Sequence, residues 1–309
     1  MKNVDGLKGK NKLREIIHFG YFGSSLENID GLSGCVSLRI AALNNVNSIM
    51  NIYGISECIE LKELDISYCE SLKNLDGLKR LNKLTKLTAC GNTSLENLDG
   101  LAGCMELKEI SFEGNKILKN IDGLRGCTGL RKIDFRDCIF LDNIKSLEDL
   151  PELEEVVFRN CSSLKDISVL ASCPNIKRVD LSGCSALENI DVLKHCTNLK
   201  EININLCGSL KSIKGLSNLV NIKWLDLSDC KSLKTLEGIE NLQGLTRVSL
   251  CGCGSLDSID ILAGLKNLSK IGPGDRRPYH YDLAFRRTGV KDIDALSIIK
   301  RLKKPGRWS

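Results

Sequence analysis

The chain has 309 residues with 44 basic and 39 acidic side chains, a formal net charge of +5. The surplus is local, because residues 271–309 hold ten basic and four acidic side chains, which leaves a net charge of −1 on residues 1–270. This balance does not favour a continuous basic stripe along the body of the protein. The sequence also lacks an apolar run of about 18 residues or more, which predicts that no helix spans a membrane.

An apolar residue recurs at a fixed interval of twenty-three along most of the chain. With that residue counted as position 1, apolar residues return at positions 4, 6, 12, 15, 18 and 21, and Cys or Asn stands at position 9. A fixed period of this length is typical of stacked repeats, in which each unit buries its apolar residues against its neighbours. Position 1 is occupied by Leu38, Leu61, Leu84, Leu107, Leu130, Leu153, Ile176, Leu199, Ile222, Leu245 and Leu268.

The N-terminal segment, residues 1–37, departs from this period. It opens with the second half of a repeat, so the sequence begins in mid-coil, and the interval from Leu13 to Leu38 is two residues longer than the period. We expect an irregular first repeat whose aromatic side chains cap the open end of the core; the alternative is that earlier coils or another domain precede it. The aromatic residues are Phe19, Tyr21 and Phe22.

Residues 38–267 form ten repeats of equal length. The early part of each repeat alternates apolar and polar residues, as in Leu64-Asp65-Ile66, which predicts a short strand in a parallel sheet. The later part spaces its apolar residues by three, which favours a 3-10 or loose helical path on the opposite side. We expect the acidic residues before these segments to cap their free N–H groups; they are Asp76, Asp99, Asp122 and Asp191.

The repeat resembles the leucine-rich-repeat superfamily, whose pattern L-x-x-L-x-L-x-x-N/C-x-L occurs at residues 130–141. Residues 118–124 are similar to the short-helix repeats of phosphatase regulatory subunits and internalins, and residues 179–184 also resemble plant immune receptors and kinetoplastid repeat proteins. The resemblance implies an α/β solenoid, a horseshoe with a concave parallel β-sheet and short 3-10, helical or irregular convex segments. It also implies a protein-binding scaffold or adaptor, in the manner of a recognition or regulatory subunit.

Thirteen of the fifteen cysteines follow the period. At position 9 they share their place with Asn92 and Asn115, which predicts a small inward group that bonds to backbone carbonyls where the strand ends. The sequence opens without an apolar leader segment, so we expect reduced thiols and an intracellular protein, cytoplasmic or nuclear; disulfides between like positions on neighbouring coils stay open. Position 9 holds Cys69, Cys138, Cys161, Cys184, Cys207, Cys230 and Cys253, and position 21 holds Cys35, Cys58, Cys104, Cys127, Cys173 and Cys196.

Positions 3, 5, 7 and 8 are expected to point to solvent on the concave face. Position 3 alternates in sign from Glu63 to Glu201, so we expect much of that row to neutralise itself. Trp224 interrupts the alternation, and Trp, Tyr and Arg side chains carry most of the binding energy at interfaces. The alternative is ordinary exposed residues that pack on their neighbours. The predicted partner-binding residues on this face are Tyr68, Arg136, Arg159, Trp224, Asp226 and Arg247.

Two further apolar rows occupy neighbouring coils. Ile117 and Phe140 both take position 11, where Ser is usual, and predict a small exposed patch. The aromatic residues at position 6 are expected to stack in the core; they are Phe112, Phe135 and Phe158.

Residues 268–309 form a C-terminal capping repeat that is interrupted by eleven additional residues within 272–289. This insertion either binds a partner or only closes the core. RNA binding through its basic and aromatic side chains, with the basic tail, is the alternative to protein binding. The candidate residues are Arg276, Arg277, Tyr279, Tyr281, Arg286 and Arg287.

The three histidines do not form a catalytic arrangement. His18, His195 and His280 occupy unrelated positions, and the one nearby pair of thiols, Cys251 and Cys253, is a weak candidate for metal binding. No phosphate-binding loop or zinc-protease motif occurs. We therefore predict a monomeric protein that is not an enzyme and that holds no cofactor and no metal.

Overall fold

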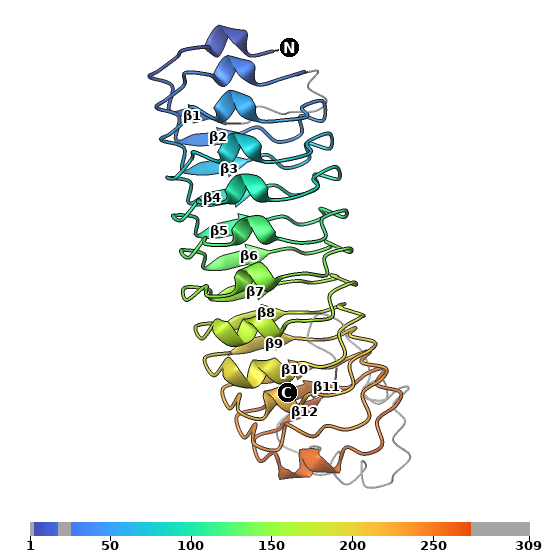
Figure 1. Ribbon diagram of the computed structural model, residues 1–309. Helices are drawn as coiled ribbons and strands as arrows, with labels where there is room; N and C mark the ends of the chain where they lie inside the picture. The colour runs from blue at the N-terminus through green and yellow to red at the C-terminus, as the bar shows by residue number, and fades with distance from the viewer. Residues whose placement is uncertain (1–2, 18–25, 273–309) are drawn as a thin grey trace, which may run out of the picture. The chain divides into compact units, whose positions relative to one another are not determined.

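The computed structural model describes residues 3–17 and 26–272, and the chain divides into two compact units, Met1–Cys161 and Ser162–Ser309. Each unit is a stack of flat coils (Figure 1), and each described coil contributes one short strand. The predicted α/β solenoid is confirmed. The aromatic residues of the irregular first repeat lie outside the described residues.

Seven strands of the first unit pair in parallel and in sequence order. Their side chains alternate between buried and exposed, as the sequence predicts. The strands are β1 (Glu15–Ile16), β2 (Ile40–Ala42), β3 (Glu63–Asp65), β4 (Lys86–Thr88), β5 (Glu109–Ser111), β6 (Lys132–Asp134) and β7 (Glu155–Val157).

The opposite side of the first unit carries one 3-10 helix in each described coil. The three-residue apolar spacing predicts this conformation, because a 3-10 turn brings residues i and i+3 into line. The helices are η1 (Asp5–Leu7), η2 (Asp30–Leu32), η3 (Tyr53–Ile55), η4 (Asp76–Leu78), η5 (Asp99–Leu101), η6 (Asp122–Leu124) and η7 (Lys145–Leu147).

The second unit repeats this plan with five parallel strands in sequence order. The strands are β8 (Arg178–Asp180), β9 (Glu201–Asn203), β10 (Trp224–Asp226), β11 (Arg247–Ser249) and β12 (Lys270–Ile271). The 3-10 helices are η8 (Ser168–Ser172), η9 (Asp191–His195), η10 (Lys214–Leu216) and η11 (Asp260–Gly264).

The strand register follows the sequence period. Glu63 pairs with Lys86 and Arg178 pairs with Glu201, each with its counterpart one full repeat further along the chain. Glu15 pairs with Ile40 across a slightly wider interval, because the first repeat is two residues longer. Like positions therefore lie side by side on neighbouring coils, and each row of the sequence becomes a row on the protein.

The core is filled by the predicted apolar positions. Leu61, Leu64 and Leu72 are almost fully buried, and the same holds for their counterparts in the described coils from residue 38 onward. Phe112, Phe135 and Phe158 stack with ring centroids 5.5 and 6.0 Å apart, which confirms the predicted aromatic row.

Glycine at position 17 sets how closely the coils approach one another. A Cβ atom on Gly100 or Gly123 would overlap the carbonyl oxygen of Leu75 or Leu98 in the preceding coil. Ser146 takes this place in one coil, and its hydroxyl donates a hydrogen bond over 2.7 Å to the Ile121 carbonyl. Only a very small residue fits where the helix backbone of one coil lies against the backbone of the next.

The residue at position 17 also marks the length of the 3-10 helix. Coils with Gly or Ser there have three-residue helices, except that the coil of Gly238 has a turn in place of a helix, whereas Val169, Val192 and Ile261 lie in the five-residue helices η8, η9 and η11. The side chains of these three residues are half-buried.

The prediction that acidic residues cap the 3-10 helices is wrong. Asp76 and Asp122 are the first residues of their helices, and their own N–H groups donate to the Oδ1 atoms of Asn74 and Asn120, at 3.2 and 3.1 Å. The same bond recurs from Asp99 and Asp191. The side chain at position 14 therefore accepts the N–H group of the first helical residue, two residues on, in an Asx turn or, where Ser212 and Ser258 stand, in the equivalent serine turn.

No helix within residues 3–17 and 26–272 combines the length and the apolar character that crossing a bilayer requires.

The replacement Gly123→Ala is expected to lower the free energy of unfolding by about 1–3 kcal/mol, because the new methyl group overlaps the Leu98 carbonyl. Urea unfolding followed by circular dichroism measures the change. The control is Gly208→Ala, whose Cβ atom meets no heavy atom within 4 Å and which should change stability by less than about 1 kcal/mol. Equal effects of the two replacements would contradict the close approach of the coils.

Candidate functional site

The solvent-exposed side of the strands, which we call the strand face, is formed by side chains at positions 3, 5, 7 and 8. Positions 4 and 6 turn inward and fill the core, so they are constrained to apolar residues, whereas the outward positions vary in polarity and charge. The strand face is therefore where the repeat leaves room for function, and we describe it separately in each unit.

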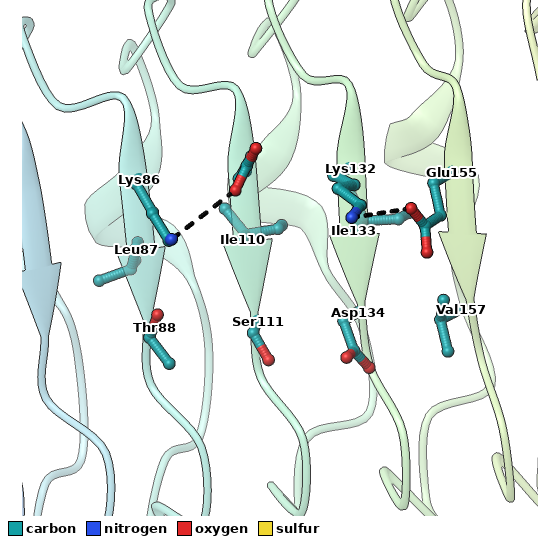
Figure 2. A pocket seen from close by; sticks show the side chains of 11 residues that line it. Lys86, Leu87, Thr88, Ile110, Ser111, Lys132, Ile133, Asp134, Glu155 and Val157 are labelled. Carbon is teal, nitrogen blue, oxygen red and sulfur yellow. Dashed lines mark ion pairs between the residues drawn. The ribbon is translucent and has the colours of Figure 1, made fainter.

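In the first unit, position 3 forms the predicted charge ladder. Lys86 lies 3.9 Å from Glu109, and Lys132 lies 2.9 Å from Glu155, as the dashed lines in Figure 2 show. These pairs border a shallow hollow of about 170 Å³ that Thr88, Ser111, Asp134 and Val157 also line. The hollow presents neutralised, solvated side chains, which agrees with the expectation for this row.

Arg136 lies within a cluster of acidic groups on the first unit. Its Nε atom donates to both carboxylate oxygens of Asp134, at 3.1 and 3.0 Å, and its terminal nitrogen lies 2.8 Å from a Glu113 oxygen. The hydrogen bond to Asp134 is the main cause that raises the pKa of Arg136 above its ordinary value. A partner that contacts Arg136 meets a guanidinium whose charge Asp134 and Glu113 already compensate.

Residues at positions 5 and 8 shape the end of each strand. The carboxylates of Asp65, Asp180 and Asp226 accept the N–H group two residues on, at 2.9 to 3.0 Å. The chain then enters the left-handed region at position 8, where Gly, Asn and Asp are usual. Tyr68 and Leu206 adopt this conformation with φ of 57° and 60°, and both side chains are about half exposed.

In the second unit, Trp224 interrupts the charge ladder. Its ring is 46% exposed, and the Arg247 guanidinium lies 5.5 Å from the ring centroid on the next strand. Such a cation–π contact stabilises both side chains. Asp226, two residues further along β10, accepts a hydrogen bond from Asn205 at 3.1 Å. The structure thus brings Trp224, Arg247 and Asp226 together on neighbouring strands.

A larger hollow, of about 320 Å³, lies beside Trp224. Arg178, Asp180, Glu201 and Asn203 line it from β8 and β9. Lys200 and Lys223, which the sequence analysis did not single out, line it as well. Both lysines occupy position 2 of successive repeats, a position that Lys62, Lys108 and Lys177 also hold, so the sequence gives no signal that sets them apart.

The remaining predicted binding residues are distributed as follows. Tyr68 and Arg159 are exposed at the strand ends of the first unit. Ile117 and Phe140 are also exposed, at 41% and 52%, on neighbouring coils. The C-terminal candidates lie outside the described residues; they are Arg276, Arg277, Tyr279, Tyr281, Arg286 and Arg287.

The cysteines at position 9 bond to the backbone as predicted. The thiols of Cys138 and Cys230 donate to carbonyl oxygens of the preceding coil at 3.2 Å. Asn115 makes the equivalent bond to Ala89 at 2.8 Å and a second to Phe112 at 2.6 Å. A hydrogen-bonding side chain at this place satisfies a carbonyl group where the strand ends.

All fifteen cysteines are free thiols, and thirteen of them are buried. Burial raises the pKa of Cys138 and of Cys207 to about 12, and it raises the pKa of Cys69 to about 11. Since the thiolate is the reactive form, these groups are poor nucleophiles and poor metal ligands. No cluster of three or more His, Cys, Asp or Glu residues suited to a metal ion occurs in the described part of the chain.

Comparison with known proteins identifies the repeat. Residues 2–119, 86–204 and 205–273 match the family model of the BspA type leucine-rich repeat region, in six copies. An internalin of Listeria monocytogenes is 17% identical with a TM-score of 0.59, over 91% of this chain and 86% of that one. The mouse RP105/MD-1 complex is 18% identical with a TM-score of 0.54, over 84% of this chain and 49% of that one. At these identities the likeness concerns the fold alone. No curated protein sequence matches the chain.

In the native chain, only Cys90 and Cys251 are expected to react readily with Ellman's reagent near pH 8, because they are the two cysteines that are not fully buried. All fifteen should react after unfolding in denaturant. The absorbance of the released thiolate gives both counts. Rapid reaction of the buried cysteines before unfolding, or a total below fifteen in denaturant, would contradict free and buried thiols.

Proposed function

Because this chain belongs to the BspA-type leucine-rich-repeat family, we propose that it is a protein-binding scaffold whose partner docks on the strand face. The repeat supplies one extended surface rather than a deep catalytic cleft. The observation that carries the proposal is Trp224, an aromatic side chain that is 46% exposed at the place where the charge ladder is interrupted.

Trp224 has the properties of an interface anchor. Burying the exposed part of this ring on binding removes apolar area from water, and Trp is among the residues that carry most of the binding energy at interfaces. Arg247 holds one side of the ring at 5.5 Å, so little side-chain freedom is lost on binding. The hollow beside the ring offers room for a side chain of the partner.

The other residues of the proposed site differ in whether hydrogen bonds within the protein hold their side chains. Tyr68 and Arg159 extend from strand ends of the first unit with exposed side chains. Asp226 and Arg136 are held by hydrogen bonds within the protein, so they present fixed polar groups and not mobile charges. We propose that the fixed groups set specificity, whereas the exposed Tyr, Trp and Arg side chains supply affinity.

The cysteines support a reducing, intracellular setting for this scaffold. Fifteen free thiols, thirteen of them buried on closely stacked coils, suit a compartment in which disulfides do not accumulate. In such a setting the protein acts as a non-enzymatic recognition or regulatory subunit whose partner supplies any catalytic activity.

Recovery of partners from source lysate, measured by quantitative mass spectrometry, tests the proposal. Trp224→Ala and Arg159→Ala should each reduce the captured partner by about tenfold or more, since truncating an interface anchor costs about 2 kcal/mol. The matched control is Lys194→Ala, an exposed residue of η9 on the opposite side of the coils. Unchanged recovery with both strand-face variants, or an equal loss with the control, would refute the proposal.

A further inference from the structure

We propose that the partner segment bound by the second unit is an acidic, extended peptide that lies across β8–β12, with a bulky apolar residue against Trp224. This inference rests on the proposed function and names the chemistry of the partner. It is carried by the charge along the edge of the strands, by the hollow beside Trp224 and by the row of carboxylates behind it.

The edge where the strands begin is strongly basic in the second unit only. Positions 2 and 3 of the coils that contain β8–β12 hold six basic residues and one acidic residue, whereas the six complete coils before them hold six basic and four acidic ones. In the first unit, Lys132 and Glu155 compensate one another at 2.9 Å. The six basic residues of the second unit are Lys177, Arg178, Lys200, Lys223, Arg247 and Lys270.

Glu201 is the one acidic residue among positions 2 and 3 of these coils. Glu201 pairs with Arg178 at 3.5 Å, and its side chain is 72% exposed. Lys200 and Lys223 stand in the same row with exposed side chains. We call the region formed by Arg178, Lys200, Lys223 and Trp224 the basic edge. Basic side chains gather at this edge although residues 1–270 carry a net charge of only −1, because the compensating acidic residues lie elsewhere on the coils.

The hollow brings the basic side chains and Trp224 into one site. Lys200, Lys223 and Trp224 all line it, together with Ile202 and Val179 at its floor. A carboxylate of a bound peptide reaches the two ammonium groups, while a neighbouring apolar side chain covers the exposed part of the Trp224 ring. The peptide therefore needs one acidic side chain and one neighbouring apolar side chain.

The carboxylates behind the basic edge favour a peptide over a nucleic acid. Asp180 and Asp226 lie two residues further along their strands and line the same hollow. A nucleic acid carries a phosphate on every nucleotide and brings some of them against these carboxylates. A peptide points alternate side chains in opposite directions, so its acidic groups meet the lysines while N–H and hydroxyl groups face Asp180, Asn203 and Asp226.

The length of the peptide follows from the strand spacing. Five parallel strands about 4.8 Å apart span about 19 Å, which about six residues of extended chain cover. The bound segment is therefore short, and a linear motif or an exposed loop of a partner protein supplies it.

Phage display tests this inference. A library of random peptides of about 12 residues, roughly twice the bound length, is selected against the full chain. Selection at about 0.15 M salt limits non-specific charge attraction. The enriched sequences should be acidic and contain a bulky apolar residue. Fluorescein-labelled synthetic copies then give dissociation constants by anisotropy.

We expect the double variant Lys200→Glu/Lys223→Glu to weaken binding of the labelled peptides by at least about tenfold and Trp224→Ala by about thirtyfold. The matched control is Lys62→Glu/Lys108→Glu, which changes exposed lysines at the same repeat position in the first unit and should alter affinity by less than about twofold. Thermal unfolding of each variant verifies that the coils are intact.

Three outcomes would overturn the inference. Enriched peptides without an acidic excess would do so, as would equal losses in the two double variants. Binding of labelled oligouridylate that the Lys200→Glu/Lys223→Glu change abolishes, without binding of acidic peptides, would assign the edge to RNA.

If the peptides fail while Trp224→Ala still removes the lysate partner, the proposed function stands and only the acidic peptide is excluded. If Trp224→Ala has no effect in either assay, both fail.

Discussion

The close contact between neighbouring coils is the constraint on which the rest of the structure depends. In most of the described coils, glycine at position 17 brings the backbone of one coil against a carbonyl group of the preceding one, and parallel hydrogen bonds fix the opposite side. With both sides held, each coil repeats the length of the one before it. Residues at the same repeat position therefore form rows across neighbouring strands. A change of residue type within such a row is then a signal of function.

This stacking separates the residues that stabilise the protein from those that are free to bind. The inward leucines, the stacked Phe side chains and the position 9 thiols all satisfy needs of the coil itself. Thiols that are buried with raised pKa values add no chemistry to the surface. The residues of the strand face and its edge vary from coil to coil, so function is expected where these rows change, as they do at Trp224.

Most of the fold could be predicted from the sequence because the constant repeat period fixes register, strands and core at once. Features that depend on backbone geometry could not. That Asn74, and not Asp76, accepts a hydrogen bond at the start of η4 depends on which side-chain oxygen reaches the N–H group, and the left-handed conformation of Tyr68 has no signal in its residue type. Of the site, Trp224 and Arg247 were found because they interrupt a pattern. Lys200 and Lys223 were missed because they continue one, and their effect appears only beside the hollow.

Hydroxyl-radical footprinting of the chain, free and bound to an acidic peptide or to a captured partner, tests most directly the claim that binding is confined to the strand face. Oxidation of Trp224 and Tyr68 is read by mass spectrometry beside that of Tyr53, an exposed residue of η3 on the opposite side of the coils. The account predicts that bound ligand protects Trp224 and leaves Tyr53 unchanged. Protection of Tyr53 with continued oxidation of Trp224 would contradict it.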